Sequence, residues 1–486
     1  MTAIGAAARA AKAPAIAGSA PDVRDGGGLR AALFPEGRKL AIEAVIIAGL
    51  IALTSFLVYH FTTHAIVNRR PLGGKNIAVA VRQFNQSQIA FASGSGSRLV
   101  GASNDLGSET LDTYVSTDAG VTWANADGPQ VPGSCAQGSP QVAVLPGGGE
   151  VLAFLGAPVC GKLQSLTPFL VVSTRTAGGA WSPLRHPAKP AWEYGFDDGP
   201  SLAAHGDRVY LAWQRGYSKF LATTVVSSSR DGGKTWTEPA IVSKALDHPH
   251  LVTTAVGKDG TLYLAGIDAK LGLWATSSRD GGRTFAAPHS IAKLLNNPAA
   301  GCAQTADQPL PRELRACEGP DPTLLVHGDG LVVVYSDAGA NQTSDVFALR
   351  LDTSLKPLGR VQVNLPDAGK TQQFAPAAAV DPTTGTTWAC WYDTTFDPHA
   401  RRTWYTCSAS HDGRRWSAPV AAASAPSAAE DIFGTIYGTG LRTSVVAVNG
   451  IAHPFWGDSR RYEDEIDVET AAIPEARAFA AAPVKG

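Results

Sequence analysis

Acidic and basic side chains recur in this chain where short apolar stretches end, often two residues after a tryptophan or tyrosine. A pair of carboxyl groups, one of them with a raised pKa, can hydrolyse a glycosidic bond, while arginines bind carboxylates through paired hydrogen bonds. The residues for which this pattern predicts an acid or base role are Asp393, Glu430 and Asp458. The residues predicted to contact a ligand are Arg215, Arg442, Arg460, Asp105 and Asp337.

Other roles fit the same carboxylates. They can accept hydrogen bonds from a sugar or another polyhydroxy ligand, with tryptophans offering stacking faces, or they can surround a hard cation. A structural role is also open, because an aspartate at a repeated position can hydrogen-bond the backbone of the neighbouring repeat. His248 and His250 stand in a turn and are expected to be surface residues. No phosphate-binding loop, HExxH or nucleophile elbow is present, so we expect no cofactor and no metal.

A Ser-x-Asp-x-Gly-x-Thr-aromatic motif repeats along the chain, and this repetition determines the architecture that we expect. In such a turn the aspartate accepts hydrogen bonds from backbone N–H groups, the glycine adopts a positive φ and the aromatic ring packs beneath. Three well-formed copies and two weaker ones occupy residues 116–123, 229–236, 278–285, 174–181 and 410–416. The wide interval before the last copy leaves room for one repeat without the motif, around 347–352.

Each repeat has the same order of four short strands, most clearly at 200–204, 208–213, 223–228 and 237–242. This order predicts a four-stranded antiparallel blade, and the repeats together predict an all-β β-propeller, with seven blades favoured over six. The last repeat lacks a strand, which residues 76–81 can supply to close the ring. Blade openings and second-strand ends then meet on one face, here called the top face. The motif turns lie on the opposite, bottom face.

On these motif copies the chain resembles the Asp-box, or bacterial neuraminidase repeat, superfamily of sialidase-like β-propellers, over residues 76–473. The resemblance implies the fold, whereas the boxes of this superfamily are structural and lie away from the active site. Sialidases grip the sugar carboxylate with three arginines and use a Tyr/Glu nucleophilic pair and an Asp acid/base. This chain lacks the Phe-Arg-Ile-Pro stretch expected near the first arginine, and seven blades exceed the usual six. We therefore favour a binding propeller, with an exo-α-sialidase as the alternative.

The chain before the repeats has two parts of opposite composition. Residues 1–38 are rich in Ala, Gly and Pro and predict a disordered tail, whereas the next segment is apolar over a length that crosses the ~30 Å hydrocarbon core of a bilayer. A signal peptide cleaved near Ala65 is the alternative. The predicted parts are thus a tail at 1–38, a transmembrane helix at 39–61, a linker at 62–75, the propeller at 76–473 and a flexible C-terminal tail at 474–486.

Six cysteines fall into three pairs that are close in sequence, without the spacing of a zinc site. They favour disulfides in an oxidising compartment and therefore a C-terminal region outside the cytoplasm. Basic residues flank the apolar segment on both sides, so charge alone does not orient it. The expected pairs are Cys135 with Cys160, Cys302 with Cys317, and Cys390 with Cys407, with buried free thiols as the alternative.

Overall charge excludes one class of partner. Charged residues make up 17% of the chain and the formal net charge is −1, so no basic surplus exists for nucleic acid. The sequence predicts a single-pass membrane protein whose extracytoplasmic propeller binds a glycan, a glycoprotein or another polar ligand on its top face.

Overall fold

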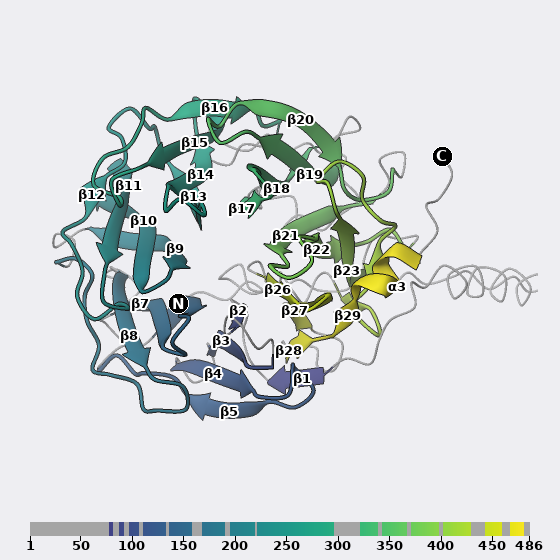
Figure 1. The fold of residues 1–486 in the computed structure, drawn as a ribbon, viewed down its shortest axis with the longest axis horizontal. Coiled ribbons are helices and arrows are strands. Elements are labelled where there is room, and N and C mark those ends of the chain that lie inside the picture. Colours follow the sequence, from purple (N-terminus) through teal and green to yellow (C-terminus); the bar gives the residue numbers. More distant parts are fainter. Residues whose placement is uncertain are drawn as a thin grey trace, which may run out of the picture. The chain divides into compact units, whose positions relative to one another are not determined.

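The computed structural model describes an all-β body built from repeated sheets. The described residues are 77–80, 87–91, 97–105, 110–132, 136–157, 168–189, 195–218, 221–295, 321–338, 343–366, 371–397, 402–428, 443–458 and 467–480. They form seven antiparallel sheets that follow one another around a ring in sequence order (Figure 1). The structure therefore confirms the seven-bladed propeller predicted from the repeats.

In the first three blades the earliest strand lies innermost and later strands step outward (Figure 1). Blade 1 contains β2 (Ser87–Phe91), β3 (Leu99–Asp105), β4 (Thr110–Ser116) and β5 (Ala124–Asp127). Blade 2 contains β6 (Ala136–Val144), β7 (Glu150–Ala157) and β8 (Phe169–Arg175). Blade 3 contains β9 (Phe196–His205), β10 (Arg208–Ser218), β11 (Leu221–Ser229) and β12 (Ala240–Ile241). Within the described residues, blade 2 has no fourth strand. Its place is taken by a single β-bridge between Val172 and Arg185, because Pro183 and Pro187 have no N–H group to extend a hydrogen-bonded ladder.

Blades 4 to 6 repeat the four-stranded pattern. Blade 4 contains β13 (His250–Val256), β14 (Leu262–Asp268), β15 (Gly272–Ser278) and β16 (His289–Ala292). Blade 5 contains β17 (Thr323–His327), β18 (Gly330–Ala338), β19 (Ser344–Leu351) and β20 (Pro357–Gln362). Blade 6 contains β21 (Gln373–Val380), β22 (Thr387–Asp393), β23 (Arg402–Ser410) and β24 (Val420–Ala421), and the short β25 (Ser427–Ala428) also pairs with β23.

Blade 7 closes the ring with strands from both ends of the repeat region. Its members are β26 (Ser444–Val448), β27 (Ile451–Asp458), β28 (Asp467–Thr470) and β1 (Ile77–Ala80). The outermost strand β1 pairs antiparallel with β28, and Ile77 faces Thr470 in the register. The predicted closure by residues 76–81 is thus confirmed, and β28 is not left as an open edge.

After β28 the chain crosses back onto blade 6. The short β29 (Ile473–Pro474) pairs with β27, and α3 (Glu475–Ala480) begins with a hydrogen bond from Glu475 N to Gly450 O at 2.7 Å. In α3, Phe479 stacks on His411 of blade 6, with ring centroids 4.2 Å apart. Part of the predicted tail at 474–486 is therefore a strand and helix that join the last two blades.

The repeated motif forms the expected turn between the third and fourth strands, here called the box turn. In the first copy Thr122 N donates to Asp118 Oδ1 at 2.9 Å, the Thr122 hydroxyl donates to Oδ2 at 2.6 Å, and Gly120 N donates to Ser116 Oγ at 2.8 Å. Gly120 has a φ of 82°. The copies at 229–236 and 278–285 repeat these hydrogen bonds. In the shortened copy at 410–416, Asp412 accepts hydrogen bonds from Arg414 N and Arg415 N.

The box turns make the propeller sensitive to acid. Hydrogen bonds from the Thr122 hydroxyl and backbone hold the pKa of Asp118 at about 2, against 3.8 ordinarily, and those from Thr284 lower the pKa of Asp280 in the same way. A carboxyl whose pKa is depressed by folding contributes stability above its unfolded pKa and loses it as pH falls through the folded value. We expect the double variant Asp118→Asn/Asp280→Asn to have a lower melting temperature than the unmodified chain at pH 6, with the two converging near pH 2.

The control for this measurement is Asp329→Asn, an exposed turn aspartate on the same face. Melting temperatures recorded from pH 6 to pH 2 should show no pH-dependent gap between this control and the unmodified chain. If the difference in melting temperature between the double variant and the unmodified chain stayed constant down to pH 2, the assigned hydrogen bonds would be contradicted.

Apolar side chains fill the interfaces between blades, and each box aromatic packs against the preceding blade. Trp123 of blade 1 lies against Phe455 of blade 7, with ring centroids 5.6 Å apart, and Trp236 packs on a buried cluster that contains Val151 and Val172 of blade 2. Blade 5 lacks the motif, as predicted for the repeat around 347–352. There Leu355, 3% exposed and with a φ of 68°, joins the cluster between blades 4 and 5 instead of an aromatic ring.

The predicted transmembrane helix lies outside the described residues, whereas one of the three predicted disulfides lies within them. No helix within the described ranges is long and apolar enough to cross a membrane, and the segment 39–61 lies outside those ranges. The disulfide Cys390–Cys407 is present, between directly paired residues of β22 and β23. The other four predicted cysteines, Cys135, Cys160, Cys302 and Cys317, lie outside the described residues.

Candidate functional site

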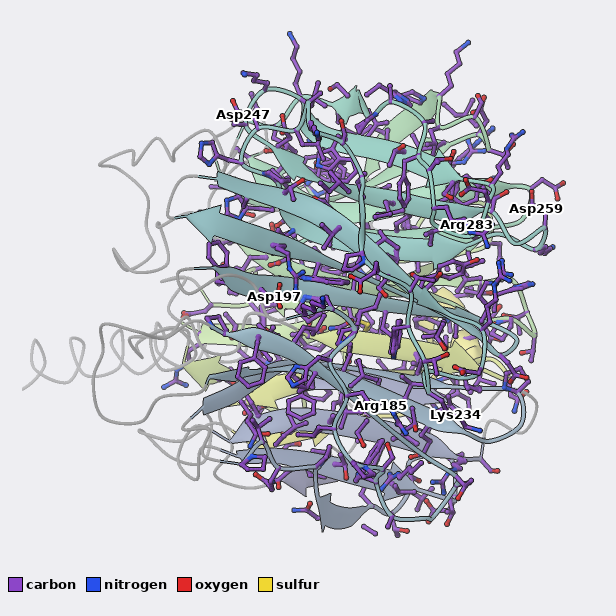
Figure 2. The ribbon with its side chains drawn as sticks, turned by 90° about the vertical axis from the view of Figure 1, so that its left-hand side faces the viewer. Arg185, Asp197, Lys234, Asp247, Asp259 and Arg283 are labelled. Carbon is purple, nitrogen blue, oxygen red and sulfur yellow. A yellow bond between two sulfur atoms is a disulfide. The ribbon has the colours of Figure 1, made fainter. Side chains whose placement is uncertain are left out.

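The two faces of the propeller carry different features. Figure 2 shows Lys234 and Arg283, from two box turns, toward one face, and Asp247, which follows the fourth strand of blade 3, toward the other. Second strands end on the side of Asp247, because Asp268 at the end of β14 accepts a hydrogen bond from Asp247 N. The top face therefore lies opposite the box turns, as the repeat pattern predicts.

Arg215, predicted to contact an anion, lies in a buried cluster on β10. Its Nε donates to Asp197 Oδ1 at 2.9 Å, and its Nη2 donates to Lys189 O at 3.1 Å. Asp197 also accepts hydrogen bonds from Trp213 Nε1 at 2.8 Å and from Leu170 N of blade 2 at 3.2 Å. Arg215 is 9% exposed, so its guanidinium is engaged in joining blade 3 to blade 2.

Asp393, predicted as an acid or base, ends β22 and is 3% exposed. It accepts hydrogen bonds from Thr395 N at 2.8 Å, from Gln373 Nε2 at 3.1 Å and from Trp391 Nε1 at 3.1 Å. Burial raises the pKa of Asp393, although these three donors act against the shift. The tryptophan two residues before the aspartate is thus a hydrogen-bond donor to it.

Asp458 and Asp337 occupy the corresponding ends of second strands in blades 7 and 5. Asp458, 1% exposed, accepts from Ser427 Oγ of blade 6 at 2.7 Å and from Trp456 Nε1 at 3.3 Å. Asp337 accepts from Leu295 N of blade 4 at 3.0 Å and lies 3.7 Å from Arg360 Nη2. Both carboxylates therefore hold the segment that follows the fourth strand of the preceding blade.

Contacts between the end of a second strand and the end of the preceding blade recur around the ring. Asp268, Asp337 and Asp458 each bind the end of the preceding blade, and Arg215 does so through Lys189 O. We call these contacts the inter-blade latches. At these four positions the polar end of the second strand joins one blade to the next. A catalytic role for Asp393 or Asp458 stays a prediction.

Four predicted site residues have side chains outside the described part of the chain. Asp105 ends β3, but its side chain lies outside the described set, as do Glu430, Arg442 and Arg460. The structure therefore brings Asp337, Asp393, Asp458 and Arg215 to the top ends of four second strands. Among the described side chains no group of three His, Cys, Asp or Glu residues could hold a metal ion.

A pocket of about 240 Å³ lies in the central channel, lined by the first strands of six blades. Sequence reasoning placed the blade openings on the top face but did not single out their small polar residues. Those lining the pocket are Gln141, Ser201, Thr254, Asp321, Thr323 and Ser444. The sequence does mark several of these positions, because the residue directly follows a proline at a blade opening.

Residues with a positive φ stand at several blade openings around this pocket, and in blades 2, 4 and 6 they accompany a break in the strand register. Ser139, Leu251, Asp321 and Ala375 adopt φ values of 49°, 49°, 39° and 48°, which non-glycine residues rarely do. In blade 4, the Gln214 side chain of blade 3, with its amide oxygen facing the bulge, accepts from Leu251 N at 3.0 Å and from Val252 N at 3.2 Å. The bulge of blade 4 is thus anchored by a side chain of blade 3.

Comparison with known proteins gives a likeness of fold at low identity. No protein-family model matches the chain, and no curated protein sequence matches it. Similar solved structures include a protein of unknown function from Dyadobacter fermentans, at 14% identity and a TM-score of 0.46, covering 66% of this chain and 94% of that one. A Hadza microbial sialidase has 14% identity and a TM-score of 0.42, covering 77% of this chain and 73% of its own.

Trypanosoma rangeli sialidase is similar at 11% identity and a TM-score of 0.42, over 83% of this chain and 58% of that one, so the chain spans little more than half of that enzyme. By its blades, its strand order and its box turns, the described chain is a seven-bladed β-propeller.

Proposed function

We propose that this chain is a membrane-anchored, extracytoplasmic propeller that binds a glycan or another polar ligand on its top face without hydrolysing it. The observation that carries the proposal is the ion pair of Arg215 with Asp197. Of the three arginines predicted for anion contact, Arg215 is the one within the described residues, and its guanidinium already has a buried carboxylate and a carbonyl as partners.

The described carboxylates support the same proposal. Asp393 and Asp458 accept hydrogen bonds from tryptophan, serine and backbone groups around them. Most glycosidases need two carboxyl groups directed at one glycosidic bond, and a sialidase needs a Tyr/Glu pair beside an Asp acid/base, whereas a binding face needs only a rigid frame with polar groups. The disulfide Cys390–Cys407 and the apolar segment at 39–61 support a membrane anchor with the propeller outside the cytoplasm.

One observation favours the alternative, a glycoside hydrolase of exo-α-sialidase type. Burial raises the pKa of Asp393, and a general acid requires a carboxyl group that stays protonated at higher pH than usual. The neighbouring hydrogen-bond donors nevertheless stabilise the ionised form, so we place this activity second.

Ligand binding is tested by screening the full-length chain, solubilised in detergent, against an array of immobilised glycans. We expect a subset of glycans to retain the chain, and heat-denatured chain to show none of this binding. If natively folded chain, checked by its tryptophan fluorescence, retained no glycan at all, the proposed binding of glycans would be wrong.

A further inference from the structure

Blade 5 lacks the box motif, and a pocket opens on the bottom face where a box would cover blade 4. The blade 4 box shows how such a turn covers its neighbour, because a methyl group placed on Gly282 would lie 3.7 Å from Tyr210 Cδ1 of blade 3. Tyr263 holds the same place in blade 4, since Tyr210 and Tyr263 each pair with the residue before the box serine of their own blade. The blade 5 turn at 352–356 contains no glycine that could lie on Tyr263 in this way.

The uncovered space is a pocket of about 340 Å³ between blades 4 and 5. Its buried lining includes the aromatic Tyr263, 4% exposed, and Leu331, 2% exposed. Exposed residues of three turns complete it, at 257–259, at 328–330 and at Thr353, and Figure 2 shows Asp259 toward the same face as the box turns. Sites for small molecules begin at ~300 Å³ and combine an apolar lining with a few polar groups, as this pocket does.

Two opposite charges line the pocket without pairing. Lys258 of blade 4 and Asp329 of blade 5 are exposed, and within the described part of the chain neither makes a hydrogen bond or an ion pair. The third charged residue, Asp259, is engaged in its own blade, because it accepts from Thr261 N at 3.0 Å and from Thr261 Oγ1 at 2.8 Å and interacts with Arg279. An ammonium group and a carboxylate that share a pocket without pairing attract the two charges of a zwitterion.

We propose that this bottom-face pocket binds a zwitterionic α-amino acid with an apolar side chain. The ligand's ammonium group binds Asp329, its carboxylate binds Lys258, and its side chain packs on Tyr263 and Leu331. Hydrogen bonds between charged groups fix the two polar ends of the ligand, while burial of its side chain supplies apolar contact. The site lies opposite the proposed ligand-binding face, so it is a second site and does not depend on the proposed function.

Titration calorimetry of the full-length chain in detergent with L-phenylalanine tests this proposal. Two analogues each lack one charge of the amino acid, since L-phenylalaninamide has no carboxylate and 3-phenylpropanoate has no ammonium group. We expect each analogue to bind about tenfold more weakly than L-phenylalanine, the loss that follows from removing one hydrogen bond between charged groups.

Two variants assign the charges to residues. Asp329→Asn should weaken the binding of L-phenylalanine and L-phenylalaninamide about tenfold and leave that of 3-phenylpropanoate unchanged. Lys258→Gln should weaken the binding of L-phenylalanine and 3-phenylpropanoate by the same factor and leave that of L-phenylalaninamide unchanged. The matched control is Asp207→Asn, because Asp207 stands in the β9–β10 turn as Asp329 stands in the β17–β18 turn, each after a His-Gly pair. This control should bind all three compounds as the unmodified chain does.

Three results would overturn the inference. They are the absence of L-phenylalanine binding by natively folded chain, binding that neither Asp329→Asn nor Lys258→Gln weakens, and binding that Asp207→Asn weakens equally. Retention on the glycan array should be the same for both pocket variants and the unmodified chain, which distinguishes this site from the proposed glycan-binding face.

Discussion

Replacing Asp197 by alanine is expected to destabilise the propeller by about 3–5 kcal/mol, the cost of leaving a buried partner charge uncompensated. Without this carboxylate, the Arg215 guanidinium keeps Lys189 O as its one hydrogen-bond partner among the described residues, and Trp213 Nε1 and Leu170 N lose their acceptor. Urea unfolding of the full-length chain, followed by tryptophan fluorescence, measures the change in the free energy of unfolding.

Two further variants make this result specific. Asp198→Ala alters the exposed neighbour and should cost less than about 1 kcal/mol, as surface substitutions do. The double variant Asp197→Ala/Arg215→Met should recover part of the loss, because it removes the stranded charge and keeps apolar volume. A loss below about 1 kcal/mol for Asp197→Ala would show that Arg215 reaches solvent, and its role in anion contact would have to be reconsidered.

Removing the disulfide Cys390–Cys407 is expected to cost about 3 kcal/mol, the stabilisation typical of a cross-link that closes a loop of this length. The two residues are 17 apart in sequence, face each other in the register of β22 and β23 and are fully buried. The variant Cys390→Ala/Cys407→Ala should therefore unfold at a clearly lower urea concentration than the unmodified chain under non-reducing conditions.

The single variants serve as the control. Either one breaks the same bond, so Cys390→Ala, Cys407→Ala and the double variant should lose similar amounts of stability, as two residues that share one interaction do. Small losses that simply add between the single variants would show that the cysteines are unlinked thiols, and would weaken the inference of an oxidising compartment.

The fold was predictable because the motif copies mark one end of each repeat and the strands between them keep a constant order. The closing strand β1 could be predicted because the last repeat lacked a strand and residues 76–81 had no other partner. The pattern could not show that in blade 5 Leu355 takes the place of the box aromatic in the core. A search for Asp, Gly and aromatic residues passes over a leucine that fills the same place with a positive φ.

The site was predictable only as a set of positions. Second-strand ends carry Asp337, Asp393 and Asp458, as expected from the repeats. Their partners, such as Leu295 N for Asp337 and Ser427 Oγ for Asp458, come from another blade, and no sequence pattern pairs them. The channel pocket depends on backbone bulges whose φ values do not follow from residue type, since Leu251 and Ala375 are not residues that favour the left-handed region.

Hydrolysis of a fluorogenic α-sialoside by the full-length chain decides whether the top face binds a ligand without catalysing hydrolysis. A known sialidase assayed in the same detergent confirms that the substrate is competent. We expect no turnover above the buffer blank, both for the unmodified chain and for Asp393→Asn. Turnover by the unmodified chain that disappears in Asp393→Asn would contradict the proposed function and establish a glycoside hydrolase.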